Sequence, residues 1–221
     1  MKPTQHKIIV TAIDLFNQRG TANVRVQDIA AAASISPGNL TYHFKNKDTL
    51  MLAVIEYVQK SLSATSLGYD LMADAEVWIK IIQNYLDFQT RFRFFYRDTL
   101  AIIRHYPEAR HFYRTHIQKI IHYNKSAIFL AVGRGFLKPE PHDGHYEVFA
   151  KNLWSVLNSW LTEREVLDDE PLDYGKCVAA LLEMHHPYFT EKGLEFYHLA
   201  EQQLPAWGDQ FKTQRELPST N

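Results

Sequence analysis

The chain has 221 residues, enough for one large domain or two smaller ones, and its 46% hydrophobic content is ordinary for a globular protein. The formal net charge of −1 excludes a basic character of the whole chain, so a nucleic-acid function would have to rest on the distribution of charge. Residues 1–50 carry a charge of +3, residues 51–138 carry +5 and residues 139–221 carry −9.

Cysteine content and apolar runs indicate the cellular location. The single cysteine, Cys177, excludes an intramolecular disulfide bond, which suits a reducing cytosol. The first residues, MKPTQHKIIV, have neither the apolar core nor the cleavage site of a signal peptide. No apolar run approaches the roughly 18 residues of a membrane-spanning helix. We therefore expect a cytoplasmic protein with no membrane partner.

The first predicted helix begins near Thr4 and stops at Gly20, a residue type that commonly follows a helix end. Its apolar residues recur at i, i+4, i+7 and i+8, which places them on one face. These residues are Ile8, Ala12, Leu15 and Phe16.

Between residues 25 and 44 the sequence predicts two short helices joined by a tight turn. The three residues before Pro37 are too few and too polar to be anything but the turn. Ser36 followed by Pro37 is the signal of an N-cap with proline at the first helical position. Leu40 and Phe44 lie four residues apart on the side expected to be buried, so the polar residues between them point elsewhere.

A short polar helix after a tight turn is the layout of a helix-turn-helix that reads double-stranded DNA. We expect Asn39, Thr41 and Tyr42 to face the bases, with Gln27 approaching from the preceding helix. Free N–H groups at the helix start and nearby basic side chains are expected to meet phosphates. The candidate DNA-binding residues are Arg25, Gln27, Ser36, Pro37, Gly38, Asn39, Thr41, Tyr42, His43, Lys45 and Lys47. The competing explanation is a structural helical subdomain with no DNA role.

Several motifs in this region resemble the N-terminal domain of TetR-family transcriptional regulators. FNQRG ends the first helix at residues 16–20, DIA opens the second at residues 28–30, and the reading helix ends in HF, followed by KDTL at residues 47–50. Two positions depart from the family pattern. Ser34 stands in the turn where glycine is usual, and Thr41 stands two residues before His43 where tyrosine is usual.

The resemblance implies a DNA-binding domain followed by a variable helical domain that binds an effector and forms a homodimer. A polar break, SLSATSLG at residues 61–68, marks the predicted boundary. We expect a helix-turn-helix domain over residues 1–62, an effector-binding and dimerisation domain over residues 68–208, and a flexible tail over residues 209–221. In the family, the helix before the boundary connects the two domains, and its tilt sets the separation of the two DNA readers.

No strand pattern is found, so the fold class is predicted to be all-α. The helices expected after the helix-turn-helix span residues 46–63, 73–105, 108–132, 145–166, 174–189 and 191–204. Pro107 and Pro187 are expected to end or kink the helices that they follow or interrupt.

The helix over residues 145–166 carries two adjacent apolar stripes, more than one core usually needs. A homodimer explains this excess, because two helices from each copy would pack as a four-helix interface. The candidate interface residues are Phe149, Leu153, Val156, Leu157, Trp160, Leu161, Val178, Leu181, Leu182 and His185. The alternative is that both stripes are buried within one chain.

The segment 91–114 interleaves aromatic residues with six arginines, which suits an anionic, partly apolar small-molecule effector. The alternatives are an amphipathic helix pair whose arginines are solvated or ion-paired, and a non-specific nucleic-acid surface. The candidate pocket residues are Trp78, Phe88, Phe92, Phe95, Tyr96, Arg97, His105, Tyr113 and His116.

Neither a cofactor nor a metal is predicted. The nearest histidine pairs, at residues 142 and 145 and at residues 185 and 186, have no cysteine or carboxylate that completes a ligand pattern. No glycine-rich phosphate loop, nucleophile elbow or zinc-protease motif occurs, so we expect no enzyme.

Together these features predict a transcriptional regulator, most simply a repressor that an unknown small molecule releases from a near-palindromic operator. Two alternatives remain from the sequence. One is a small-molecule binding protein with a vestigial helix-turn-helix, and the other is an all-α enzyme of unknown reaction.

Overall fold

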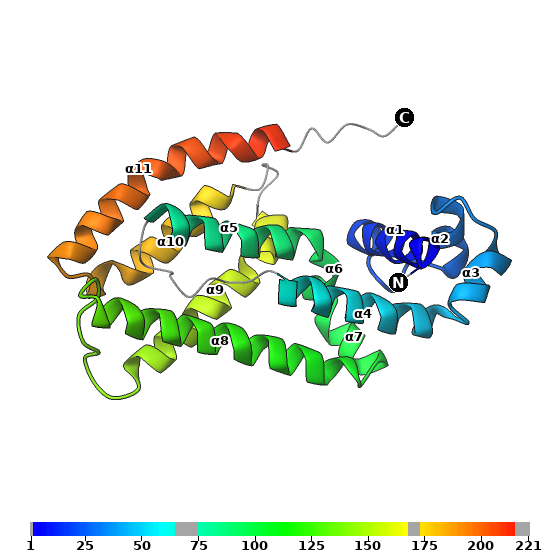
Figure 1. Ribbon diagram of the computed structural model, residues 1–221, viewed down its shortest axis with the longest axis horizontal. Coiled ribbons are helices and arrows are strands. Elements are labelled where there is room, and N and C mark those ends of the chain that lie inside the picture. Colours follow the sequence, from blue (N-terminus) through cyan, green and yellow to red (C-terminus); the bar gives the residue numbers. More distant parts are fainter. Residues whose placement is uncertain (1, 65–74, 168–172, 215–221) are drawn as a thin grey trace. The chain divides into compact units, whose positions relative to one another are not determined.

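The computed structural model describes residues 2–64, 75–167 and 173–214, and every regular element in these ranges is a helix (Figure 1). An isolated antiparallel bridge pairs Leu137 with Phe189. The fold class is therefore all-α, as predicted. The helices are α1 (Pro3–Arg19), α2 (Val26–Ala32), α3 (Pro37–His43), α4 (Lys47–Ala64), α5 (Ala75–Arg91), α6 (Arg93–Arg97), α7 (Thr99–His105), α8 (Ala109–Gly133), α9 (His145–Leu167), α10 (Tyr174–His185), the 3₁₀ helix η1 (His186–Tyr188) and α11 (Glu191–Gln214).

The chain divides into two compact units. The first consists of residues 1–66 and 88–116, and the second of residues 67–87 and 117–221. This division differs from the expected boundary near residues 62–68, because residues 88–116 pack with the N-terminal helices rather than with the rest of the body.

Charge follows this division. The first unit contains 13 Lys and Arg against 6 Asp and Glu, a formal charge of +7. The second contains 11 against 19, a formal charge of −8. The near-neutral chain is therefore one basic unit joined to one acidic unit.

The core of the first unit joins the helix-turn-helix to α6 and α7. Ile8 and Phe16 of α1 are fully buried at the predicted i, i+8 spacing, and so is Leu40 of α3. Phe94 and Phe95 of α6 belong to the same cluster, and the Phe94 ring lies 5.5 Å from that of Phe16. The helix-turn-helix therefore does not fold on α4 alone but shares its core with the segment that follows α5.

The single helix predicted over residues 73–105 is wrong, because the chain breaks twice, at Phe92 and at Asp98. The first break has an identifiable cause. The Asn17 side chain accepts a hydrogen bond from the Phe94 N–H at 2.9 Å and donates one to the Arg91 carbonyl at 2.9 Å. A side chain from α1 thus occupies backbone groups on both sides of the break, which is a known way of interrupting a helix.

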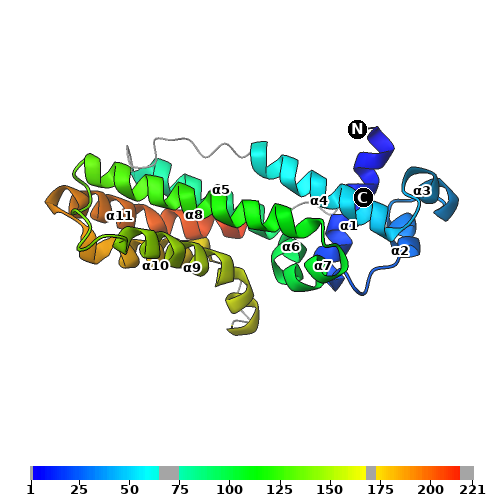
Figure 2. The same ribbon diagram turned by 90° about the horizontal axis from the view of Figure 1, so that it is seen from below.

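The second unit is built from most of α5 and α8 together with α9, α10, η1 and α11, and α10 lies along α11 and against α9 (Figures 1 and 2). Pro187 ends α10 as expected, and the chain continues into η1. The last helix extends to Gln214 rather than ending near residue 204. The end of the predicted tail, residues 215–221, lies outside the described residues.

Cys177 has no exposed surface, and burial raises the pKa of its thiol to about 12. It therefore serves as a small apolar core residue, as the sequence predicts.

Both apolar stripes of α9 pack within a single chain. These side chains therefore follow the alternative given above, burial within one chain, rather than the predicted dimer interface. Of the ten candidate interface residues only Val156, which is half-buried, keeps more than a small exposed surface. The excess of apolar residues is explained by packing on two sides of α9 in the second unit, against α10 and around a cavity described below. An interface on α9 would therefore have to use a different face.

Candidate nucleic-acid interface

The turn between α2 and α3 is held by backbone hydrogen bonds. The N–H of Ser34 donates to the Ala31 carbonyl at 3.0 Å, and that of Ile35 donates to the Ala30 carbonyl at 3.0 Å. Ser34 adopts a left-handed conformation with φ of 54°. Ser36 caps α3, because its Oγ accepts a hydrogen bond from the Asn39 N–H at 3.1 Å. The predicted helix-turn-helix geometry and its cap are confirmed.

The left-handed Ser34 leads to a prediction about stability. A non-glycine residue in this region costs about 1 kcal/mol, because Cβ crowds the backbone. We expect Ser34→Gly to raise the free energy of unfolding by about 0.5–1 kcal/mol, measured by urea denaturation. Ser36→Ala in the same motif is the control with opposite sign, since loss of the cap should cost about 1 kcal/mol. A Ser34→Gly protein less stable than the parent would contradict this explanation.

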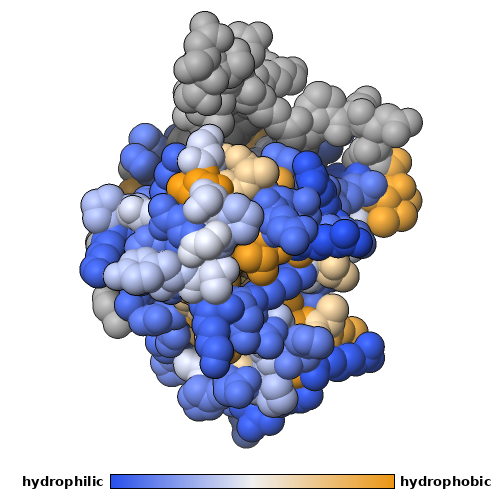
Figure 3. All heavy atoms as spheres, turned by 90° about the vertical axis from the view of Figure 1, so that its right-hand side faces the viewer, coloured by the Kyte–Doolittle hydropathy of each residue, from blue (hydrophilic) through white to orange (hydrophobic). Residues whose placement is uncertain are grey.

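The α3 helix presents a polar edge to solvent, while Leu40 and the following Phe44 are buried. Tyr42 is 80% exposed, although aromatic rings are usually at least partly covered. The end of the first unit that carries α2 and α3 faces the viewer in Figure 3 and is mostly hydrophilic. The candidate residues that are exposed here are Arg25, Gln27, Ser36, Pro37, Gly38, Asn39, Thr41, Tyr42 and Lys45.

Two of the candidate DNA-binding residues, His43 and Lys47, are only partly exposed. His43 is half-buried, and its ring lies 5.2 Å from that of Tyr42. Lys47 is also half-buried, and its Nζ donates to the Thr21 carbonyl at 2.6 Å. Burial lowers the pKa of Lys47 despite the nearby Asp48 and Asp28 carboxylates. Lys47 therefore holds the start of α4 against the α1–α2 turn, while its remaining N–H donors are available to a phosphate.

The Thr41 hydroxyl donates to the Pro37 carbonyl at 2.9 Å, so its proton is already used within α3. The oxygen lone pairs and the methyl group are what Thr41 offers to a partner. A bidentate contact to a base edge is expected from Asn39 rather than from Thr41, because the Asn39 amide combines donors with an acceptor.

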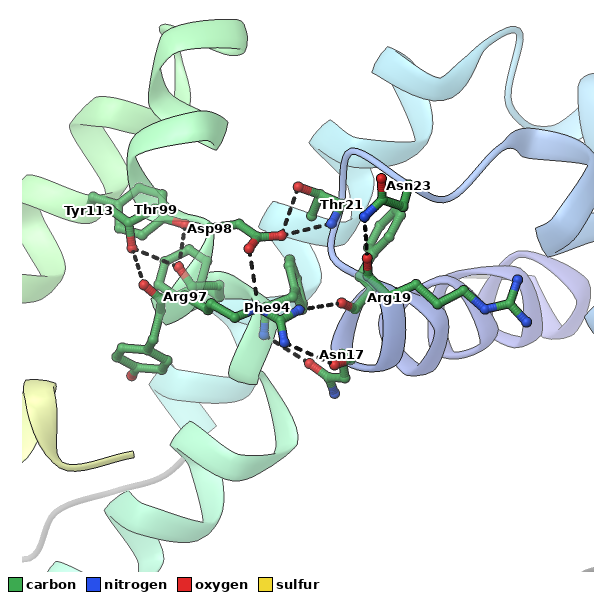
Figure 4. Close-up of polar contacts among 12 residues, drawn as sticks. Asn17, Arg19, Thr21, Asn23, Phe94, Arg97, Asp98, Thr99 and Tyr113 are labelled. Carbon is green, nitrogen blue, oxygen red and sulfur yellow. Dashed lines mark hydrogen bonds and ion pairs between the residues drawn. The ribbon is translucent and has the colours of Figure 1, made fainter. Parts of the chain in front are cut away.

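A polar joint fixes the α1–α2 turn to the segment joining α6 and α7 (Figure 4). Asp98 Oδ2 accepts hydrogen bonds from the Thr21 N–H at 2.7 Å and from the Thr21 hydroxyl at 2.9 Å. The Arg97 guanidinium donates to the carbonyls of Phe16 at 2.9 Å and Asn17 at 3.3 Å, near the C-terminal end of α1. The Phe16 carbonyl also accepts a hydrogen bond from the Gly20 N–H, so Arg97 adds a charged donor at the end of α1, where a positive charge interacts favourably with the helix dipole.

Most of the predicted pocket residues lie in the same unit as this joint. Eight of the nine belong to the first unit, and all but the exposed His105 lie in or against its core or in its polar joint: Phe88, Phe92, Phe95, Tyr96, Arg97, His105, Tyr113 and His116. Phe95 stacks on Tyr113 with ring centroids 4.0 Å apart, and the Tyr113 hydroxyl donates to the Phe95 carbonyl at 2.8 Å. His105 borders a separate pocket of mixed polarity between the α1–α2 turn, α4 and α7.

A largely apolar cavity lies in the second unit, with about 710 Å³ of empty space including its open mouth. Trp78 is the one predicted pocket residue that lines it. Its other walls are Ile81, Ile82 and Tyr85 of α5, Ile120, Tyr123, Asn124, Ala127, Ile128 and Ala131 of α8, Leu137 of the connection between α8 and α9, Leu153 and Leu157 of α9, and Leu181 and His185 of α10. The α8 residues recur at helical spacing over residues 120–131, a signal that sequence reasoning missed because it favoured the arginine-rich segment before it.

Within the described ranges, no group of three or more His, Cys, Asp or Glu side chains is arranged to hold a metal ion. None of the helices described is both long enough and apolar enough to cross a membrane.

The fold and this geometry define a helix-turn-helix protein with a separate cavity-bearing helical unit. Comparison with known proteins makes the class specific. Residues 8–54 match the family model described as bacterial regulatory proteins, tetR family, and residues 56–197 match the model of a bacterial transcriptional repressor. The chain therefore belongs to the TetR family of bacterial regulatory proteins.

Individual relatives are similar over less of their length. The probable HTH-type transcriptional regulator YttP of Bacillus subtilis is 29% identical over 103 residues, which cover 43% of this chain and 50% of YttP. The matched part thus spans about half the length of this curated relative, and less of others.

Solved structures of the family share the fold over nearly the whole chain. A TetR-family regulator from Marinobacter aquaeolei VT8 has a TM-score of 0.75 at 22% identity, covering 96% of this chain and 99% of that chain. A gamma-butyrolactone receptor described as ArpA-like has a TM-score of 0.66 at 17% identity, covering 92% of this chain and 96% of that one. At this level of identity the similarity shows the fold alone.

Proposed function

We propose that this protein is a sequence-specific transcriptional repressor that binds a near-palindromic operator in double-stranded DNA as a homodimer and is released by a small-molecule effector. The polar edge of α3 carries the proposal. Asn39 and Tyr42 are exposed on a helix whose other face is anchored by Leu40. A helix held in this way presents its side chains to the major groove without losing its own packing.

Charge supports the same reading. The +7 of the first unit favours a polyanion, although the chain as a whole is close to neutral. Lys45 and Arg25 are exposed on either side of the turn, where phosphates flank a groove-bound helix. Operator affinity is therefore expected to fall steeply with salt concentration.

Dimerisation requires a face other than the predicted apolar stripes. The exposed side of α9 carries an uncharged stripe at helical spacing, made of Val148, Asn152, Ser155, Ser159, Thr162 and Val166. The Ser155 and Ser159 hydroxyls donate to carbonyls four residues earlier in α9, at 3.0 and 2.8 Å. Because these donors are already hydrogen-bonded within the helix, burial of the two side chains at an interface would leave no hydroxyl proton unpaired. We assign the dimer contact to this stripe.

Ser159→Arg is expected to convert the dimer to a monomer, because two copies of a large cation would meet near the dimer axis. Sedimentation velocity measures the change directly. Ser126→Arg on exposed α8 is the matched control and should leave the dimer intact. A Ser159→Arg protein that remained dimeric would place the interface elsewhere.

The cavity in the second unit is assigned to the effector. To release DNA, the effector must bind the DNA-incompetent arrangement of the dimer more tightly than the competent one. The relatives carry the names of transcriptional regulators, and we propose no catalytic activity and a cytoplasmic location for this chain. A vestigial helix-turn-helix would have no need of the intact Ser36 cap or of the exposed α3 edge.

Selection of genomic fragments by the purified protein tests the proposal. Recovery of a near-palindrome whose half-sites lie about one helical turn apart is expected. Recovery of random fragments only, from protein shown to be free of copurified ligand, would contradict it.

A further inference from the structure

The walls of the second-unit cavity carry no Lys, Arg, Asp or Glu. The side chains among them with polar atoms are Trp78, Tyr85, Tyr123, Asn124 and His185. Burying a carboxylate in such surroundings would cost several kcal/mol without a compensating cation. The arginines that suggested an anionic effector do not line this cavity.

His185 presents one hydrogen-bond acceptor. Its Nδ1 lies 2.7 Å from the Leu181 carbonyl, which can only accept, so Nδ1 carries the proton. In the neutral ring Nε2 is then an acceptor, and it has no partner among the described residues. His185 as a whole is 8% exposed and lines the cavity.

Packing fixes the ring in this orientation. The Trp78 ring meets it edge-on with centroids 6.1 Å apart, and the Phe149 ring does so at 5.0 Å. Burial lowers the pKa of His185, which keeps the ring neutral near pH 7. Protonation would remove the acceptor.

Asn124 adds a second acceptor on α8. Its Nδ2 donates to the Ala150 carbonyl at 3.3 Å, which assigns the amide orientation and leaves Oδ1 without a partner among the described residues. The Tyr85 and Tyr123 hydroxyls can donate or accept, whereas His185 Nε2 and Asn124 Oδ1 can only accept. These two atoms therefore favour a ligand that brings its own N–H or O–H groups.

We infer that the cavity binds an uncharged, largely apolar molecule whose hydroxyl or N–H group donates a hydrogen bond to His185 Nε2, and that it excludes anions. That this molecule acts as the effector rests on the proposed function. The binding itself does not, because it involves only the second unit.

A matched set of probes tests this inference: octan-1-ol, which can donate, octyl methyl ether, which can only accept, and octanoate, which is anionic. Binding to the full chain is measured by isothermal titration calorimetry without DNA at pH 7. We expect octan-1-ol to bind about tenfold more tightly than the ether, the worth of one neutral hydrogen bond, and octanoate to bind more weakly still.

His185→Phe retains a ring of similar size but lacks the acceptor. It should reduce the affinity for octan-1-ol about tenfold and leave the affinity for the ether unchanged. Ala127→Phe, which fills the cavity from α8, should reduce the affinity for all three probes. Thermal unfolding of each variant checks that the fold is retained, and His185→Gln, which keeps an acceptor, replaces His185→Phe if that variant fails to fold.

Tighter binding of octanoate than of octan-1-ol would overturn the inference. So would an alcohol-to-ether ratio that His185→Phe leaves unchanged, or the failure of octan-1-ol to bind up to its solubility limit. Binding of the alcohol by a protein that recovers no operator would count against the proposed function and leave the ligand class intact.

Discussion

Replacing both Asn39 and Tyr42 with alanine is expected to lower the affinity for the operator on the order of a hundredfold, while binding to random DNA changes little. Each side chain projects from the exposed edge of α3, and a good base contact is worth about 1–3 kcal/mol. Because both side chains are exposed, the free energy of unfolding should stay within about 0.5 kcal/mol of the parent. Titration of labelled operator and random duplexes measures the two affinities.

Lys45→Ala is the informative control, since Lys45 is expected to meet a phosphate rather than a base. It should weaken operator and random DNA alike and reduce the slope of log affinity against log salt by about one. If the Asn39/Tyr42 variant behaved like Lys45→Ala, the α3 residues would be phosphate contacts only. An unchanged operator affinity in the double variant would mean that another surface reads the DNA.

The second large effect is expected at the polar joint, where Asp98→Ala should lower the free energy of unfolding of the first unit by about 2–4 kcal/mol. Two hydrogen bonds to the carboxylate are lost, and the N–H of Thr21, a residue only 8% exposed, is left without its partner. Asp98→Asn retains one acceptor oxygen for Thr21, so its loss should be about half as large.

Hydrogen exchange at the Thr21 amide is the appropriate readout for Asp98→Ala, because all the tryptophans lie in the second unit and report on it instead. Exchange should accelerate strongly in Asp98→Ala and less in Asp98→Asn. Lys60→Ala, which removes an exposed ion pair with Glu56 in the same unit, is the control and should have little effect. Equal protection in parent and Asp98→Ala proteins would show that the joint contributes nothing to stability.

Features set by local chemistry were predictable from the sequence. The Ser36 cap, the burial of Leu40 and Phe44 and the end of α10 before Pro187 are all confirmed, because each depends on residues a few positions apart. The DNA contacts themselves remain a prediction.

Features set by distant residues were not predictable. The break after α5 depends on Asn17, which lies 74 residues before the carbonyl that it contacts. For the arginine-rich segment the sequence leaves both a pocket and an amphipathic helix pair open. In the structure Arg97 binds carbonyls of α1, and Arg91 donates to the Tyr57 hydroxyl at 3.0 Å. Helical periodicity identifies which faces are buried, but it does not identify the partner that buries them.

The same limit explains the dimer prediction. Two apolar stripes on α9 indicate two packing partners, and both partners turned out to lie in the same chain. The interface assigned here, on the uncharged side of α9, has little hydrophobic signal, since valine stands only at its two ends and the residues between are asparagine, serine and threonine.

Reading of the operator sequence by α3 is tested by the ratio of affinities for the recovered operator and for a scrambled duplex of equal length, measured at two salt concentrations. We expect a ratio of at least about a thousand, with both affinities falling steeply as salt rises. A ratio near one at both concentrations, from ligand-free dimer, would show that this chain holds DNA by charge alone and that α3 does not read its sequence.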